Sequence, residues 1–155
     1  MSQQMTLARA LRYKKRVVAK IAALEADIQT NNTLIEGAEQ EVDIRQALKD
    51  RDALVTHLTE LKLAMTKATF SVFPHILEVA ELKSKIAFLG RIPTTHGVHR
   101  DRYGETSATY RAELRKKEVT NTVTQLQSQI DDLQAKIDAY NNKTTITLED
   151  VSVAV

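Results

Sequence analysis

The sequence predicts a mainly α-helical protein: an antiparallel helical bundle or coiled coil with a basic glycine-containing loop and one or two short strands. Three observations predict it. Aromatic residues make up only 5% of the 155 residues, whereas globular cores take much of their buried area from aromatic side chains. Four Gly and two Pro are too few for the many tight turns of an all-β fold. Small and aliphatic residues recur at helical spacing, which is typical of helix–helix seams.

The first helix is expected at residues 6–31. Its apolar residues step by four, three and four, which places them on one side of a helix. Thr6 is a suitable N-cap, because its hydroxyl can accept a hydrogen bond from a free amide of the first turn. The apolar row consists of Val17, Ile21, Leu24 and Ile28.

Two further helices are expected at residues 42–68 and 74–89. Arg51 is the only charge in the apolar row of the first of these two, which otherwise holds Ala47, Leu54, Leu58, Leu61, Met65 and Ala68. Pro74 suits the first turn of the next helix, because its missing N–H has no partner there. Gly90 is well suited to the position just past its end. The apolar row of this helix is Val79, Leu82, Ile86 and Leu89.

The fourth helix, residues 116–140, has the most regular pattern in the chain. Its apolar residues step 4-3-4-3-4-3 over three heptads, which is typical of a coiled-coil seam. Asn141 and Asn142 are expected to end it. The tail, 141–155, alternates Thr with Ile and Leu, so it either adds a strand or is loose. The seam is Val119, Val123, Leu126, Ile130, Leu133, Ile137 and Tyr140.

Residues 90–104 hold three of the four glycines and are expected to be a loop. Residues 106–114 alternate in polarity and predict a short strand, although Ala, Glu and Leu there also suit the start of a helix. We expect one helical domain spanning residues 1–155. Narrow stripes need partner helices, which the same chain or a second copy can supply. We expect a homo-oligomer, with residues 116–140 packing across a symmetry axis.

The loop is the first candidate site. It is rich in Arg and His, and Arg offers a planar fork of donors that fits phosphate or carboxylate oxygens. A Tyr or His ring can stack on a base. These residues predict a site for an anionic ligand, either a phosphate-containing small molecule or a nucleotide; the alternative is an ordinary basic surface loop. The candidate ligand-binding residues are Arg91, His96, His99, Arg100, Arg102, Tyr103 and Arg111.

The second candidate is the basic start of the chain, where residues 1–24 hold six Lys or Arg and no acid. Four of these cations share one helix face. Contact with nucleic-acid phosphates is one interpretation. The other is a solvated face that pairs with the acidic stretch Glu36, Glu39, Glu41 and Asp43. The four cations are Arg9, Arg12, Arg16 and Lys20.

Several classes of site are not expected. The chain has no Cys, and His96 and His99 alone do not make a zinc site, so no metal and no cofactor is expected. No catalytic motif is found, and we expect no enzyme and no catalytic residue. No signal peptide or membrane-spanning stretch is expected. We therefore expect a cytoplasmic protein without a membrane partner, in the host cytoplasm or the virion if a phage encodes it.

Short motifs along most of the chain suggest a relationship. They are the opening Leu7-Ala8-x-Ala10-Leu11, the break from Asn31 to Gly37, Leu82-Lys-Ser-Lys-Ile86, the strand-like segment near Tyr110, and Leu133-x-x-x-Ile137 before Asn141. In these the chain resembles the septicolysin-like family of small helical proteins of bacteria and phages. The chain departs from the family at Asn142, where a Trp is usual, and at Thr69-Phe70, where Thr-Asn is usual. The resemblance implies a helical oligomer and a phage origin, and it transfers no catalytic residues.

The sequence thus predicts a non-enzymatic helical homo-oligomer that binds an anionic ligand through residues 90–104. If a phage encodes it, sequestering a host nucleotide signal is a role that the loop composition suits. One alternative is a structural or adaptor protein, such as a virion component. The third hypothesis is nucleic-acid binding through the basic first helix.

Overall fold

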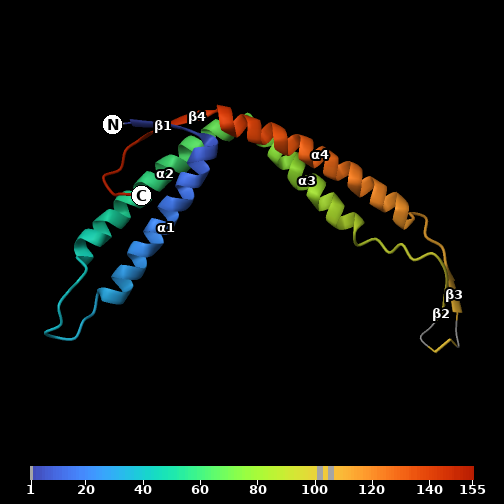
Figure 1. Cartoon of the computed structure of the whole chain (residues 1–155), viewed down its shortest axis with the longest axis horizontal. Coiled ribbons are helices and arrows are strands. Elements are labelled where there is room, and N and C mark those ends of the chain that lie inside the picture. Colours follow the sequence, from blue (N-terminus) through green and yellow to red (C-terminus); the bar gives the residue numbers. More distant parts are fainter. Residues whose placement is uncertain (1, 101–102, 105–106) are drawn as a thin grey trace. The chain divides into compact units, whose positions relative to one another are not determined.

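The computed structural model describes residues 2–100, 103–104 and 107–155. That part of the chain is mainly helical, as the sequence predicts (Figure 1). It also carries two short antiparallel sheets, with four strands where one or two were expected. The helices are α1 (Leu7–Asn31), α2 (Ile44–Thr69), α3 (Phe73–Leu89) and α4 (Lys116–Lys143). One sheet pairs β1 (Ser2–Thr6) with β4 (Thr145–Glu149), and the other pairs β2 (Gly97–Arg100) with β3 (Ser107–Tyr110).

The helix ends follow from local hydrogen bonds. The predicted cap at Thr6 is confirmed, because its hydroxyl accepts from the Arg9 amide at 3.3 Å. Helix α2 begins two residues later than predicted, since Asp43 caps it by accepting from the Gln46 amide at 3.0 Å. The predicted end of the fourth helix at residue 140 is wrong. Its bonding continues to the Thr144 amide, which donates to the Tyr140 carbonyl at 2.9 Å.

The chain divides into two compact units, which we describe separately. Unit 1 comprises Met1–Ser71 and Asp138–Val155, and unit 2 comprises Val72–Ile137. The expectation of a single domain stays a prediction.

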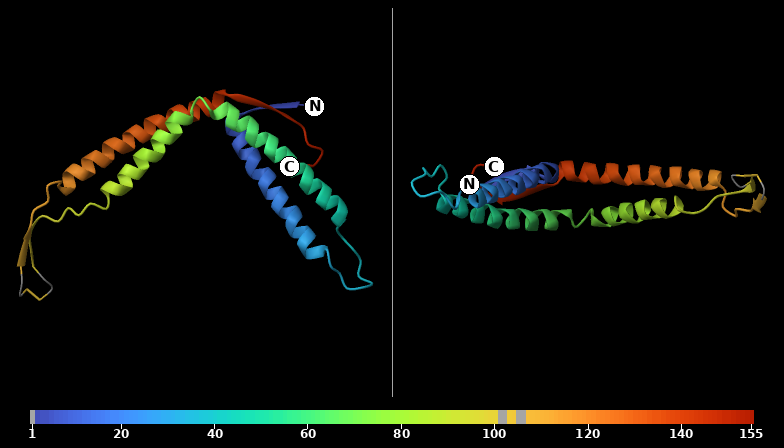
Figure 2. Two further views of the ribbon diagram at one scale, coloured as in Figure 1. Left: turned by 180° about the vertical axis from the view of Figure 1, so that it is seen from behind. Right: turned by 90° about the horizontal axis from the view of Figure 1, so that it is seen from below.

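Unit 1 is built on α1 and α2, which run antiparallel (Figures 1 and 2). The predicted apolar rows face each other and leave Val17, Leu54 and Leu61 with 0% exposure. The β1–β4 ribbon covers one end of this pair, where it buries Met5, Ile146 and Leu148 against both helices. Val151, Val153 and Val155, near the end of the chain, pack against a second apolar cluster formed by Val17, Ile21 and Leu54. Of the two predicted outcomes for the tail, the strand is confirmed.

Unit 2 contains α3, the β2–β3 hairpin and most of α4. The predicted seam of α4 is buried at Leu126, Ile130, Leu133 and Ile137, with 4–8% exposure. In α3, Val79 is the buried residue. The prediction of a loop throughout residues 90–104 is wrong in part, because Gly97–Arg100 forms strand β2. The predicted strand at 106–114 is confirmed at Ser107–Tyr110; residue 106 lies outside the described residues.

Candidate functional site

The predicted basic loop is one strand of an antiparallel hairpin, β2–β3. Its register pairs Gly97 with Tyr110, His99 with Ala108, and Arg100 with Ser107. Since paired residues share a face and neighbours along a strand alternate, His99 and Tyr110 lie on one face and Arg100 lies on the other. The hairpin therefore presents its rings and the Arg100 guanidinium in opposite directions.

Two hydrogen bonds brace the base of the hairpin. The Ala112 amide donates to His96 Nδ1 at 3.2 Å, across the two ends of the strand pair. His99 Nε2 lies 3.2 Å from the His96 carbonyl oxygen and donates to it. His96 therefore helps to close the base of the hairpin through its Nδ1 and its carbonyl. Its predicted role in ligand binding stays a prediction.

The ring of Tyr110 packs edge-on against His99, with centroids 5.7 Å apart and an interplanar angle of 77°. Tyr110 was not among the predicted site residues, although its place in the alternating stretch was a signal for a face shared with a neighbouring strand. Half of its surface is exposed, so the His99–Tyr110 pair forms a small aromatic platform that is open to solvent.

The remaining predicted residues are spread along the segment. Arg91 and Arg111 are exposed, and the Arg111 Nε contacts Glu113 Oε1 at 3.3 Å, with both side chains 83% exposed. Tyr103 is 86% exposed, and Arg102 lies outside the described residues. The arrangement is an open, two-sided basic surface. It does not converge on a pocket within the described part of one chain.

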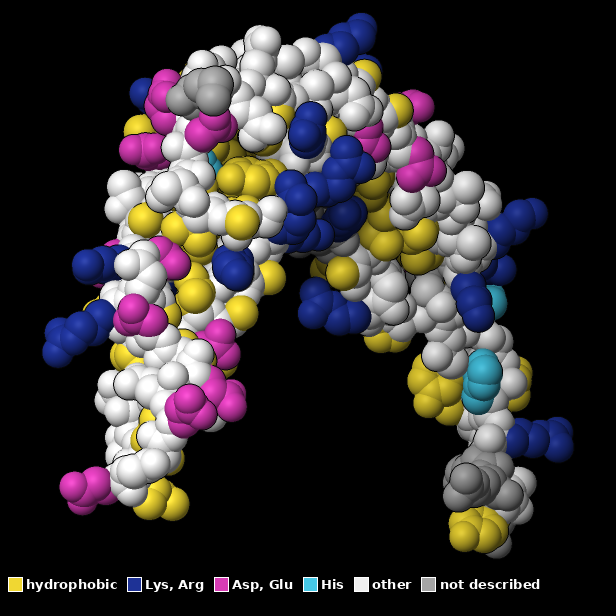
Figure 3. Space-filling view, turned by 60° about the vertical axis from the view of Figure 1, so that its left-hand side comes forward, with side chains coloured by type: hydrophobic (Ala, Val, Ile, Leu, Met, Phe, Trp, Pro, Cys, Tyr) yellow, Lys and Arg dark blue, Asp and Glu magenta, His cyan; other side chains and the backbone are white. Residues whose placement is uncertain are grey.

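The second candidate surface lies on α1. All four predicted cations, Arg9, Arg12, Arg16 and Lys20, are exposed. The Arg16 guanidinium lies over the Tyr13 ring, 5.4 Å from its centroid. In Figure 3, Lys and Arg side chains gather near the upper end of the helix pair, where Asp and Glu side chains are also visible, and a further acidic group lies towards the lower end.

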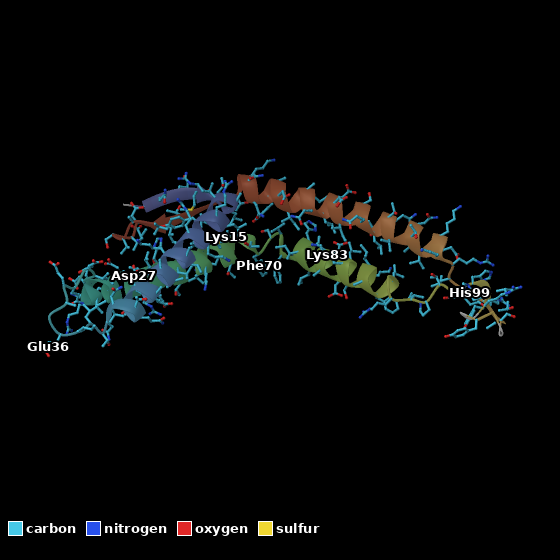
Figure 4. The ribbon with its side chains drawn as sticks, turned by 60° about the horizontal axis from the view of Figure 1, so that its bottom comes forward. Lys15, Asp27, Glu36, Phe70, Lys83 and His99 are labelled. Carbon is cyan, nitrogen blue, oxygen red and sulfur yellow. The ribbon has the colours of Figure 1, made fainter. Side chains whose placement is uncertain are left out.

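The expected pairing of this basic face with the acidic stretch is wrong within one chain. Lys15 lies in the first half of α1, whereas Glu36 lies at the tip of the α1–α2 loop, beyond Asp27 (Figure 4). The rest of α1 after Lys20 separates the two groups, about 16 Å at 1.5 Å per residue. The cations of α1 and the acidic stretch therefore lie at different levels of unit 1.

Tyr13 and His57 form a buried polar pair that the sequence did not predict. The Tyr13 hydroxyl lies 3.0 Å from His57 Nε2, and His57 is 5% exposed. Burial raises the pKa of Tyr13 above its ordinary 10.0, and Asp150 acts in the same direction, whereas Arg16 lowers it. A cavity of about 380 Å³ lies beside His57, lined by Ala53, Thr56, His57, Glu60, Glu149, Asp150 and Val151.

The described residues contain no group of three His, Asp or Glu side chains placed to hold a metal ion. Within the same residues, no helix has both the length and the apolar character needed to cross a bilayer. The chain has no Cys.

Comparison with known proteins gives a similar fold without a function. No family model and no curated protein matches the sequence. A solved structure from Corynebacterium diphtheriae, described as a functionally unknown conserved protein, is similar with a TM-score of 0.62. The similarity covers 93% of this chain and 99% of that one at 16% sequence identity. At that identity, the likeness shows a shared fold alone.

Proposed function

We propose that this protein is a non-enzymatic helical homo-oligomer whose β2–β3 hairpin binds an anionic group of a ligand or partner. The observation that carries the proposal is the hairpin itself. It exposes Arg100 on the face opposite the aromatic platform of His99 and Tyr110. Arg91 and Arg111 are exposed in the segments that flank the hairpin. Guanidinium groups suit phosphate oxygens, and an open ring suits a flat base.

The two-sided geometry refines the predicted ligand. A small molecule held by His99 and Arg100 together would have to reach both faces of a two-stranded ribbon. A hairpin of this kind therefore suits an extended anionic surface, or a nucleotide enclosed between hairpins of two copies. The antiparallel bundle, the oligomer, membership of the septicolysin-like family, and a place in the host cytoplasm or virion are parts of this proposal.

Calorimetry with inorganic phosphate and a panel of mononucleotides and cyclic nucleotides tests the hairpin. We expect Arg91→Ala with Arg100→Ala to weaken binding at least about tenfold, because a hydrogen bond to a charged group contributes roughly 1.5–3 kcal/mol. The matched control is Lys49→Ala with Lys62→Ala, two exposed cations of α2, which should bind like the wild type. Absence of heat across the panel, or equal loss in the control, would overturn the proposal.

The second candidate function is nucleic-acid binding through α1, and the four exposed cations along one helix face favour it. Binding to duplex DNA or RNA should then weaken steeply with salt, because each neutralised phosphate releases counterions. Arg12→Ala with Lys20→Ala should lower the slope of log K against log salt by roughly two. Salt-independent binding would reject this function. A structural or adaptor protein that docks its hairpin on another protein would bind neither ligand class.

A further inference from the structure

Helix α3 carries two apolar faces on opposite sides. At about 100° per residue, Val79, Leu82, Ile86 and Leu89 share one face, and these residues are buried or half-buried. The opposite face carries Phe73, Ile76, Leu77, Ala80, Ala87 and Phe88, all of them exposed. A helix that is apolar all round is normally covered on every side. Within unit 2, the described residues leave one side of α3 uncovered.

The exposed face contains large side chains that are costly to leave in water. Phe73 is 49% exposed, Leu77 52% and Phe88 57%. These large residues lie toward the two ends of the helix, and the small residues Ala80 and Ser84 lie between them. Small residues at the centre allow the backbone of another helix to approach closely, while large residues at the ends fill the space where crossing helices diverge.

We propose that this face of α3 packs against the same face of a second copy of the chain, with the two helices antiparallel. A register centred next to Ala80 places Phe73 beside Phe88 of the other copy. It also places Leu77 beside Ser84 of the other copy. Such a contact is isologous, because the same residues contribute from both sides, as in most homodimers.

Charge supports a second copy as the occupant, and it supports the antiparallel direction. Glu78 and Glu81 lie in the first half of α3, and Lys83 and Lys85 lie in the second. In the antiparallel register, Lys85 of one copy lies level with Ile76 of the other, about 3 Å along the helix axis from Glu78 on the same flank. A parallel register would align the acidic halves with each other and the basic halves with each other. Reversed packing therefore sets the acidic half of each helix against the basic half of the other.

The size of the face sets the expected affinity. A helix of 17 residues is about 25 Å long, so one such contact buries roughly half of the ~800 Å² per partner of a standard interface. We therefore expect weak association that is seen only at the upper end of the tested concentrations. The inference rests on the homo-oligomer of the proposed function and names its surface. It does not require the hairpin to bind an anion.

Sedimentation equilibrium between about 1 µM and about 500 µM tests the surface. The wild-type mass should rise with concentration from 17.4 kDa towards twice that value. Leu77→Asp should stay monomeric throughout, because the pairing would bury its carboxylate. Leu63→Asp is the matched control, since Leu63 lies on α2 and is 56% exposed; this variant should dimerise like the wild type. Equal helical circular dichroism in all three proteins shows that the fold is kept.

The outcomes separate the surface from the proposed function. A wild type that stays monomeric overturns both this surface and the homo-oligomer. A dimer that Leu77→Asp does not weaken overturns the α3 surface alone.

Disulfide trapping tests the direction, since the chain has no cysteine of its own. Ala80→Cys lies at the centre of the proposed register and should form a covalent dimer under mild oxidation. Ser84→Cys should not, because the two copies of this position are then about 10 Å apart along the helix axis, beyond the reach of a disulfide. Equal crosslinking of both variants would reject the antiparallel register, and so would crosslinking of Ser84→Cys alone.

Discussion

The α1–α2 pair and helix α3 contain similar apolar residues but bury them to different extents. In the pair, each helix turns its main apolar face to the other, and Val17, Leu54 and Leu61 lose all contact with solvent. Helix α3 has apolar residues on two sides and buries Val79 alone. The number of faces that a helix presents, rather than its apolar content, therefore decides how much of it one chain can bury.

The largest expected change in stability comes from a substitution in the α1–α2 pair. Leu54→Ala should destabilise unit 1 by about 3 kcal/mol, because it removes apolar contacts and leaves a cavity between α1 and α2. Urea denaturation followed by circular dichroism measures the change. Leu63→Ala, at an exposed position of the same helix, should change the free energy of unfolding by less than about 0.5 kcal/mol. Similar losses in the two variants would contradict the packing described for this pair.

A smaller effect is expected for the buried polar pair between the same helices. Tyr13→Phe leaves the His57 ring without the hydroxyl that lies 3.0 Å from it. Loss of one partner of a buried polar group typically costs about 1–3 kcal/mol. The free energy of unfolding near neutral pH, compared with that of the wild type, measures this cost. An unchanged value would show that the pair contributes nothing to the contact of α1 with α2.

The same variant also changes the pH dependence of stability. The pKa of Tyr13 is raised in the folded protein, so the folded state holds this proton more tightly than the unfolded chain does. The stabilisation is complete below the unfolded pKa of 10.0 and is lost as pH rises through the folded value. The stability difference between wild type and Tyr13→Phe should therefore shrink above pH 10. A constant difference would mean that the hydroxyl does not titrate with folding.

The smallest change in stability is expected for the ion pair between the second half of α1 and the first half of α2. Arg51 contacts Glu25 at 2.9 Å, with side chains 35% and 43% exposed. Solvent-exposed pairs contribute about 0.2–1 kcal/mol. A double-mutant cycle of Arg51→Ala and Glu25→Ala should give a coupling energy in that range, decreasing at high salt. A coupling above about 2 kcal/mol would show that this pair is better shielded than its exposure indicates.

The sequence predicted the helices well because each has a local signal. The steps of four and three located the buried row of every helix, and the cap at Thr6 needed only the first turn of α1. The charge at Arg51, which interrupted an apolar row, was explained only by the partner helix that brings Glu25 to it.

Strand β1 was missed for a physical reason. Ser2, Gln3 and Gln4 are polar and exposed, so no alternation marks a strand there. Its partner β4 lies more than 130 residues further along the chain, and no local pattern shows such a pairing. Strand β2 was predicted as a loop because its segment is short and rich in glycine. Val98 is its one β-branched residue, and Gly97 before it weakens a strand.

The candidate site was predicted only in part. Residue types identified the basic segment, but they could not show that alternation along β2 separates His99 from Arg100. The second face of α3 was also overlooked. Val79, Leu82, Ile86 and Leu89 already form one complete apolar row, whereas Phe88 of the second face is separated from Phe73 and Leu77 along the chain by Glu and Lys residues.

The pairing of β1 with β4 has a consequence for synthesis of the chain. Met5 and Leu7 are made about 140 residues before Ile146 and Leu148, which cover them. At about 5–20 residues per second, this end of unit 1 stays uncovered for roughly ten seconds or more, until β4 has been synthesised. During that interval the nascent protein presents an uncovered apolar end, where a chaperone would find its earliest contact.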